Sequence, residues 1–203
     1  LAARLLAPKS VRSIGIVGTG RQALLQLRML EYVTDCRDVV VFGRSKDGVE
    51  KFLAANEASA FRIKPTESLR RLVSSCNLIV TTTSADKPLI MAEDLQEGTH
   101  ITGVGADSPG KHEIDPEVFR KASVVAVDSK SQCFAFGDTS HALKSHAIKE
   151  KDVVEIGEIA ANKLLGRKSE RDITVADLTG VAVQDMAAAE SVYRKIRGGS
   201  CKR

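Results

Sequence analysis

The chain has 203 residues, of which 43% are hydrophobic and 28% charged, and this balance predicts a globular protein with a substantial core. Its formal net charge is +4, from 30 basic and 26 acidic residues. The two signs are interspersed and no apolar run is long enough to cross a bilayer, so neither nucleic acid nor a membrane is expected as a partner.

Two features at the level of composition concern the cellular setting. The cysteines lie far apart without paired spacing, and no signal peptide precedes them, so we expect reduced thiols and a cytoplasmic location; they are Cys36, Cys76, Cys133 and Cys201. A basic cluster ends the chain, and we interpret it as a solvated tail rather than a binding patch. Its members are Arg194, Lys195, Arg197, Lys202 and Arg203.

Short apolar segments alternate with helical patterns over the first 127 residues. The predicted elements are, in chain order, a strand at 13–18, a helix at 21–33, a strand at 39–42, a helix at 47–57, a strand at 61–63, a helix at 66–75 capped by Thr66, strands at 78–82 and 99–104, a helix beginning at Asp115-Pro116 and a strand at 124–127. Strands that are apolar throughout and alternate with helices indicate a parallel sheet covered on both faces. The predicted fold class is therefore α/β, a Rossmann-like doubly wound parallel sheet with helices on both faces.

The pattern changes beyond residue 129. It predicts a polar stretch to 151, a helix at 153–165, an apolar run at 173–176 and a last helix from Val181 to about Ile196. The domain organisation that follows is a connecting helix at 1–10, an NAD(P)-binding Rossmann-like domain at 11–180, and a C-terminal helix with a basic tail at 181–203.

A glycine-rich turn follows the first predicted strand directly and opens a helix. Residues 18–23 fit the pattern G-x-G-x-x-A. Gly18 permits a tight turn, Gly20 lets the backbone approach a pyrophosphate, and Ala23 allows close packing of helix on strand. The pattern alone is weak evidence, but its place between strand and helix predicts a dinucleotide site, with contacts from Gly18, Thr19, Gly20, Arg21 and Gln22.

The end of the second strand bears on the choice of dinucleotide. Gly43, Arg44 and Ser45 stand where an NAD-specific domain usually presents an acidic residue to the ribose hydroxyls. Arg44 with Ser45, and Lys46 beside them, fits a 2′-phosphate instead, so NADP(H) is the preferred cofactor and NAD(H) a possible one. The alternatives are that the basic side chains face solvent, or that Arg44 stacks on the adenine.

Threonines end the fourth strand, on the edge where an open α/β sheet binds its ligand. Thr81, Thr82 and Thr83 are candidates for contact with the cofactor ribose or the backbone around it. Threonine also favours strands for steric reasons alone.

A longer set of collinear segments resembles the ornithine cyclodeaminase/mu-crystallin family. The most distinctive is Gly103–Glu113 (GVGADSPGKHE), which is similar to the signature loop of that family. The further matches are 127–129 with Gln132, 155–158 (EIGE), Gly166-Arg167, 177–189 (DLTGVAVQDMAAA) and the opening 1–7 (LAARLLA). The resemblance covers nearly the whole chain.

The resemblance implies roles for particular residues. Asp107 matches the carboxylate that acts as acid or base at the substrate amine or imine, and a carboxylate after a central strand suits that chemistry. The alternative is that Asp107 caps the turn at 108–110. Thr179, Gly180 and Val181 match the segment that runs close to the nicotinamide, although Gly180 also suits a turn before the last helix.

Basic and histidine side chains near Asp107 are weaker candidates. Lys111 and His112 are placed to bias its protonation or to meet a substrate carboxylate, but a surface position is the simpler interpretation. His141 and His146 lie five residues apart without a cysteine or carboxylate at ligand spacing, so no metal site is expected.

The family resemblance also implies an N-terminal region that supplies the substrate-binding basic residues and most of a homodimer surface. The chain opens at Leu1, inside the family pattern, so we expect the cofactor-binding part of a longer protein, with little turnover by itself. The expected function is NAD(P)-dependent hydride transfer at an amino acid or cyclic imine, as in an ornithine cyclodeaminase, a ketimine reductase or an amino-acid dehydrogenase. The alternatives are a crystallin-like protein that binds NADPH and a small ligand without turnover, or a truncated inactive product.

Overall fold

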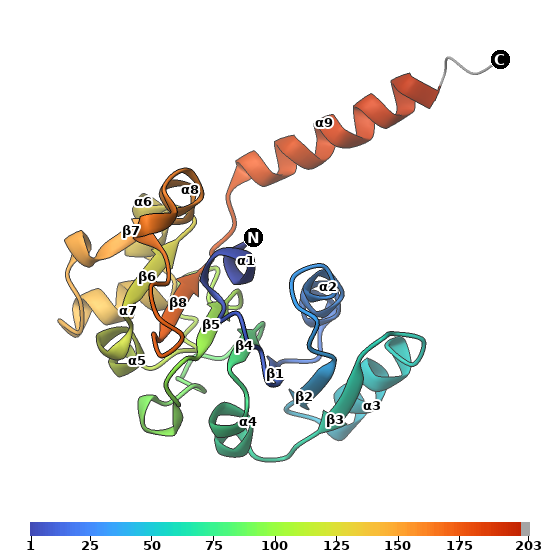
Figure 1. Ribbon diagram of the computed structural model, residues 1–203, viewed down its shortest axis with the longest axis horizontal. Coiled ribbons are helices and arrows are strands. Elements are labelled where there is room, and N and C mark those ends of the chain that lie inside the picture. The colour runs from blue at the N-terminus through green and yellow to red at the C-terminus, as the bar shows by residue number, and fades with distance from the viewer. Residues whose placement is uncertain (200–203) are drawn as a thin grey trace.

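The computed structural model describes residues 1–199 and has a single eight-stranded sheet in which every pair of neighbouring strands is parallel (Figure 1). From one edge to the other the strands are β3 (Arg62–Pro65), β2 (Asp38–Phe42), β1 (Ile14–Val17), β4 (Leu78–Thr81), β5 (His100–Gly103), β8 (Thr174–Asp177), β6 (Val124–Val127) and β7 (Val153–Glu155). The chain builds outward from β1 to β3 and then returns to place β4 on the other side of β1. The ends of β1 and β4 thus form the switch point at which such sheets bind ligands.

Helices cover both faces of the sheet. One face carries α1 (Ala2–Leu6), α2 (Arg21–Leu30), α3 (Lys46–Ala55) and α8 (Ile156–Ala161), and the other carries α4 (Leu69–Ser75), α5 (Pro116–Lys121), α6 (Lys130–Ala135) and α7 (Asp138–Lys144). Short 3₁₀ turns lie at Ala92–Asp94, Glu150–Asp152 and Lys163–Leu165. This architecture confirms the predicted fold class.

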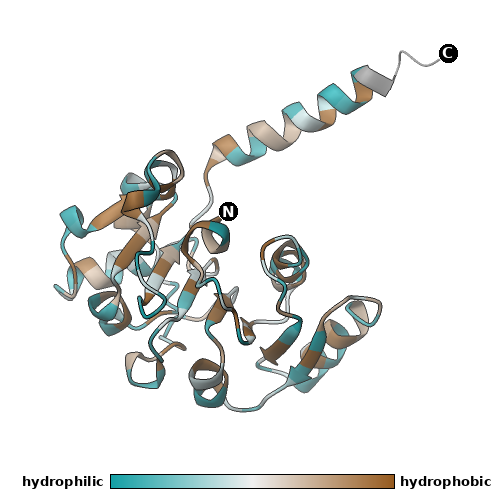
Figure 2. Cartoon of the chain, in the orientation of Figure 1, coloured by the Kyte–Doolittle hydropathy of each residue, from teal (hydrophilic) through white to brown (hydrophobic). Residues whose placement is uncertain are grey.

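The two faces arise from the alternation of side chains along each strand. Ile16 of β1 packs with Leu27 of α2, whereas the next residue, Val17, joins the cluster that holds Leu72 of α4. In β1, β4 and β6 every residue is buried, and these strands are almost entirely apolar (Figure 2).

The structure differs from the sequence prediction in its second half. The predicted helix at 153–165 is wrong over its first three residues, which form the edge strand β7 next to β6. Its helical part, α8, begins after Glu155, whose side chain and that of Glu158 make reciprocal capping bonds. The predicted polar stretch before 151 contains α6 and α7.

One helix start was also misplaced. The fourth helix begins after Ser68, whose hydroxyl accepts from the Arg71 N–H at 3.2 Å, and Thr66 instead accepts from the Ser68 N–H. By contrast, Asp115 caps α5 ahead of Pro116, as the sequence predicts.

The last helix, α9 (Ala182–Gly199), projects from the body of the molecule (Figure 1). It exposes Met186, Val192 and Tyr193. Arg194 of the basic cluster pairs with Glu190 at 2.6 Å, whereas Lys202, Arg203 and Cys201 lie outside the described residues. In the described part of the chain, no helix is long and apolar enough to span a membrane.

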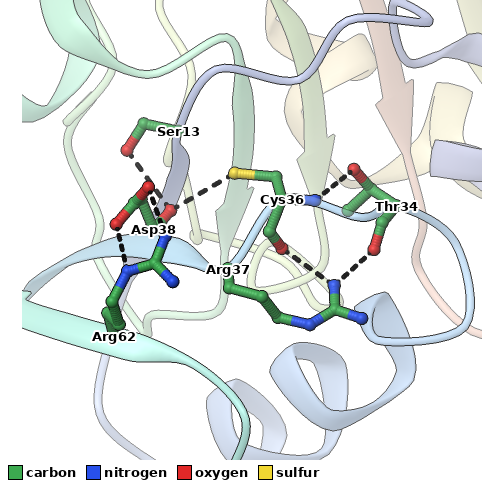
Figure 3. Close-up of polar contacts among 6 residues, drawn as sticks. All are labelled: Ser13, Thr34, Cys36, Arg37, Asp38 and Arg62. Carbon is green, nitrogen blue, oxygen red and sulfur yellow. Dashed lines mark hydrogen bonds and ion pairs between the residues drawn. The ribbon is translucent and has the colours of Figure 1, made fainter.

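Polar contacts hold the amino end of β2, opposite the switch point (Figure 3). Arg62 of β3 donates twice to the Asp38 carboxylate, at 2.9 and 2.8 Å, and this hydrogen bonding lowers the pKa of Asp38. The Arg37 guanidinium donates to the carbonyls of Thr34 and Cys36. These bonds fix the loop before β2 and leave the carboxyl edge of the sheet free for a ligand.

Candidate functional site

The glycine turn after β1 lies at the switch point and leaves room for a phosphate. Gly18 has φ +110°, and a Cβ atom on it would stand 2.6 Å from the Thr82 hydroxyl oxygen. Gly20 is the N-cap of α2, and a Cβ there would meet nothing within 4 Å. Gly18 is therefore required by the fold, whereas the space above Gly20 is open at a helix N-terminus, where backbone N–H groups attract anions.

Two adjoining clefts run along the sheet edge from this turn. The first, of about 580 Å³, is lined by residues from the ends of β1, β2 and β4, among them Gly18, Thr19, Gly20, Gly43, Arg44, Thr82 and Thr83. The second, of about 610 Å³, continues past β2 and is lined by Arg44, Lys46, Val49, Glu50 and Glu67, among others. Together they bring half of the predicted cofactor residues to one surface.

The second cleft lies at the N-terminus of α3. The Ser45 hydroxyl oxygen caps this helix by accepting from the Gly48 N–H at 3.1 Å. Arg44 and Lys46 are exposed beside it, and Lys46 lies 3.9 Å from the Glu67 carboxylate. The cleft therefore offers basic groups and a helix start, with acidic side chains on its far wall.

Thr81 takes a different position from the other threonines. It is fully buried, and its hydroxyl donates to the Glu113 carboxylate at 2.7 Å. Direct contact of Thr81 with a cofactor stays a prediction, which this burial disfavours.

A third cavity, of about 380 Å³, lies between α1, α2 and the ends of β5 and β8. The polar side chains that line it are those of Gln22, Gln26, Thr102, Asp107, Asp128, Thr179 and Gln184, and Gly180 lines it as well. Arg21, the other predicted residue of the first α2 turn, is exposed next to Gln22.

Asp107 stands at the mouth of this cavity. Its side chain is 49% exposed, and the Lys111 ammonium donates to its carboxylate at 2.6 Å. Lys111 is thus the recorded partner of Asp107, in place of the turn at 108–110 that the alternative interpretation required. The pair combines a proton-accepting group with a cation beside the cavity.

The segment predicted to contact the nicotinamide, 179–181, is fixed by hydrogen bonds to the side chains of Asp128 and Gln132. The Asp128 carboxylate accepts from the Gly180 N–H at 2.7 Å and from the Thr179 hydroxyl at 3.2 Å. The Gln132 amide donates to the Gly180 carbonyl at 2.6 Å. Val181 follows as a half-buried residue before α9.

The histidines do not gather into a metal site. His112 and His141 stack with their ring centroids 3.9 Å apart, each with its Nε2 facing a backbone carbonyl. Burial, and then the neighbouring His141, lowers the pKa of His112. Among the described residues no group of three metal-binding side chains occurs.

Three buried carboxylates lie beneath the cavity at the ends of β4, β5 and β8. Glu113, Asp138 and Asp177 are each at most 1% exposed. Burial, and then the negative charge of Asp177, raises the pKa of Asp138 to about 8, and burial raises the pKa of Asp177 as well. Protonation of Asp138 relieves the repulsion between two buried charges.

A family model matches residues 1–200, nearly the whole chain, and its description is the ornithine cyclodeaminase/mu-crystallin family. The chain belongs to this family.

Individual relatives agree with that assignment. An alanine dehydrogenase of Archaeoglobus fulgidus is 38% identical over 196 residues, which cover 95% of this chain and 59% of the relative. Among solved structures, an archaeal alanine dehydrogenase dimer with bound NAD matches with a TM-score of 0.91 at 35% identity, over 100% of this chain and 62% of that one.

A third relative was solved with both a dinucleotide and an amino acid bound. The Thermococcus litoralis Δ1-pyrroline-2-carboxylate reductase in complex with NADH and L-proline matches with a TM-score of 0.92 at 29% identity, over 98% of this chain and 62% of that one. The chain spans 59–60% of the length of the first curated relatives that it matches.

The sequence interpretation gave no role to the residues that support the site. Asp128 and Gln132 lie within matched family segments, and Glu113 ends the signature loop, so a signal for their importance was present. Asp138 carried no such signal, because its two backbone donors belong to a segment 25 residues away.

Proposed function

We propose that this chain is the dinucleotide-binding part of an enzyme that transfers hydride between a nicotinamide cofactor and the carbon–nitrogen centre of an amino acid or its imine. The observation that carries the proposal is the single sheet edge on which an open phosphate-binding turn, Gly18–Gly20, stands beside a cavity bordered by Asp107. The NAD and NADH bound in related structures, and the imine and amino-acid substrates named for those relatives, support the same assignment.

In this proposal the chain's own groups bind and orient the dinucleotide. The N–H groups at the start of α2 hold the pyrophosphate above Gly20. Thr82 and Thr83 border the middle of the cleft and contact the nearer ribose. Arg44, Ser45 and Lys46 surround the far ribose, where their positive charge favours the 2′-phosphate of NADP(H) while still admitting NAD(H).

The nicotinamide ring of the bound dinucleotide supplies or accepts the hydride. Asp107 exchanges a proton with the substrate nitrogen, and the Lys111 ammonium donates to its carboxylate at 2.6 Å. Thr179 and Gly180, held by Asp128, present a short backbone segment on which the ring packs. A substrate carboxylate needs a fixed cation, which we assign to residues outside this chain.

The proposal is tested in two steps. NADH and NADPH fluorescence titrations of this chain measure cofactor binding, and the intact protein is then assayed with Δ1-pyrroline-2-carboxylate and with pyruvate plus ammonium. Asp107→Asn is expected to lower turnover by a factor of about 10² to 10⁴ and leave the Kd for NADH within about twofold. Nucleotide binding without turnover of either substrate by the intact wild type would favour a binding protein instead.

Assembly is a further part of the proposal. The intact protein is expected to be a homodimer, as the archaeal alanine dehydrogenase is, and the exposed apolar side chains of α9 are available for an interface. Light scattering of the intact protein checks the mass. We also keep the cytoplasmic location as a proposal, based on the free thiols of Cys36, Cys76 and Cys133.

A further inference from the structure

Glu113 joins two loops that come from different strands. Its carboxylate accepts from the Thr81 hydroxyl at 2.7 Å and from the Thr83 N–H at 2.6 Å, both at the end of β4. It also accepts from the Gly105 N–H at 2.8 Å, just after β5. All three donors are neutral; burial raises the pKa of Glu113, and these hydrogen bonds lower it in turn.

The Glu113 carboxylate is closely packed against the backbone of Gly105. A Cβ atom on Gly105 would lie 2.1 Å from the Thr83 carbonyl oxygen and 2.5 Å from the Glu113 carboxylate. The backbone at Gly105 is therefore in direct contact with both partners, and only glycine fits there. A small displacement of either loop is transmitted to the other.

The same loop is fixed at its other end. The N–H groups of Glu113 and Ile114 both donate to the Asp138 carboxylate, at 2.8 and 3.0 Å. The segment 105–113 is thus anchored at its first and last residues, and Asp107 and Lys111 lie between the anchors. Asp107 owes its position to these buried contacts, since its own side chain is half exposed.

We propose that Glu113 is a positioning residue, which sets Asp107 relative to the bound cofactor by joining the Thr81–Thr83 segment of the dinucleotide cleft to the loop that carries Asp107. The inference rests on the proposed function, because it assigns Asp107 its distance from the nicotinamide. Glu113 itself lies beneath the cavity, fully buried, and does not reach a ligand.

Two substitutions weaken the hydrogen bonds between Glu113 and the two loops to different degrees. Glu113→Gln keeps the side-chain volume but turns one acceptor into a donor, which opposes either the Thr83 N–H or the pair from Thr81 and Gly105. Thr81→Val is nearly isosteric and removes one donor while leaving the two backbone bonds. Glu117→Gln is the matched control, because it makes the same chemical change at an exposed position of α5.

The experiment compares these variants in the intact protein by steady-state turnover of Δ1-pyrroline-2-carboxylate, by binding of ADP-ribose, which has no nicotinamide, and by amide hydrogen exchange at Thr83 and Gly105. For Glu113→Gln we expect kcat to fall at least about tenfold, with the KM for the imine and the Kd for ADP-ribose within about twofold of wild type. Exchange at both amides should be faster by about tenfold or more. Thr81→Val should lower kcat by a smaller factor, and Glu117→Gln should match wild type.

Several results would overturn the inference. An unchanged kcat in Glu113→Gln would do so, as would a loss of kcat matched by an equal loss of ADP-ribose binding, since that pattern reports general unfolding. If Glu113→Gln does not fold, the inference is tested with Thr81→Val instead, and a kcat of that variant equal to wild type refutes the positioning role of Glu113. If the intact wild type binds NADH but reduces no imine, the proposed reaction is wrong. The amide exchange rate at Gly105 in Thr81→Val and Glu113→Gln still tests the connection through Glu113: faster exchange supports it, and an unchanged rate refutes it.

Discussion

The two glycines of the phosphate-binding turn offer a test that separates binding from folding. Both are replaced by alanine, one at a time. At Gly18 the added Cβ lies 2.6 Å from the Thr82 hydroxyl oxygen and φ is +110°, whereas at Gly20 it meets nothing within 4 Å. The same chemical change therefore strains the fold at Gly18 and, at Gly20, points into the open space assigned to the pyrophosphate.

The expected magnitudes follow from these environments. A positive φ costs an alanine about 1–2 kcal/mol, and the contact with Thr82 adds to this, so Gly18→Ala should lower the free energy of unfolding by about 2 kcal/mol or more. At Gly20 alanine loses the small N-cap preference of glycine but gains about 0.4–1 kcal/mol from a less flexible unfolded chain. These effects nearly cancel, so stability should change by less than about 0.5 kcal/mol.

The assay combines urea denaturation with NADH titration of the same samples. Gly20→Ala should raise the Kd for NADH by about tenfold or more, equivalent to about 1.4 kcal/mol, because its methyl group stands where the pyrophosphate approaches. A Gly20→Ala variant with wild-type stability and wild-type affinity would refute the assignment of this turn to the pyrophosphate. Wild-type stability in Gly18→Ala would refute the backbone conformation on which the argument depends.

Three further predictions concern specificity, stability and pH. Arg44→Ala should raise the Kd for NADPH by about fivefold and that for NADH by less than about twofold, with exposed Arg28→Ala as the control, because only NADPH has a phosphate for the guanidinium to bind. The Arg167 guanidinium donates to the carbonyl oxygens of four residues and to a threonine hydroxyl, and these bonds connect α1 with β8 and the segment before it. Arg167→Met should therefore lower the free energy of unfolding, measured in urea, by about 2–4 kcal/mol. Burial raises the pKa of Asp138 from 3.8 to about 8, so the stability that its protonated form contributes is lost as the pH rises through that window. Urea melts should therefore show a smaller loss of stability between about pH 5 and 8 in Asp138→Asn than in wild type, and equal losses would contradict the raised pKa.

The first half of the fold was predictable from sequence because local and tertiary signals agree there. The segments that became β1, β2 and β4 are apolar, β-branched and bounded by turn residues, and β1 and β2 are each followed by a helix. The second half was harder. Val153 and Val154 continue without a break into a helical pattern, and only their pairing with β6 makes them a strand.

The residues of the candidate site also fall into a group that the sequence predicts and a group that it does not. Residues that line the first cleft, such as Gly20 and Thr82, were predictable, because a glycine turn or a strand-end threonine is recognised from a local pattern. Chemistry that depends on three separated segments has no local pattern. Glu113 is recognisable in sequence only as the end of a family loop, and its partners Thr81 and Gly105 lie 32 and 8 residues away.

The buried carboxylates show why this second kind of residue belongs in any account of the site. A half-exposed Asp107 on a loop that contains Gly105 and Gly110 would by itself sample many positions, and hydride and proton transfer tolerate little displacement. A hydrophobic contact beneath the loop would exclude water without fixing its direction. A carboxylate that accepts from Thr81, Thr83 and Gly105 fixes both distance and direction, because each hydrogen bond must keep its geometry or leave a buried polar group unsatisfied. The cost of burying Glu113 with unsatisfied acceptors is thus what holds the two loops at a fixed separation. The same reasoning explains why the Glu113→Gln variant, whose side chain has nearly equal size, should fold and yet misplace Asp107.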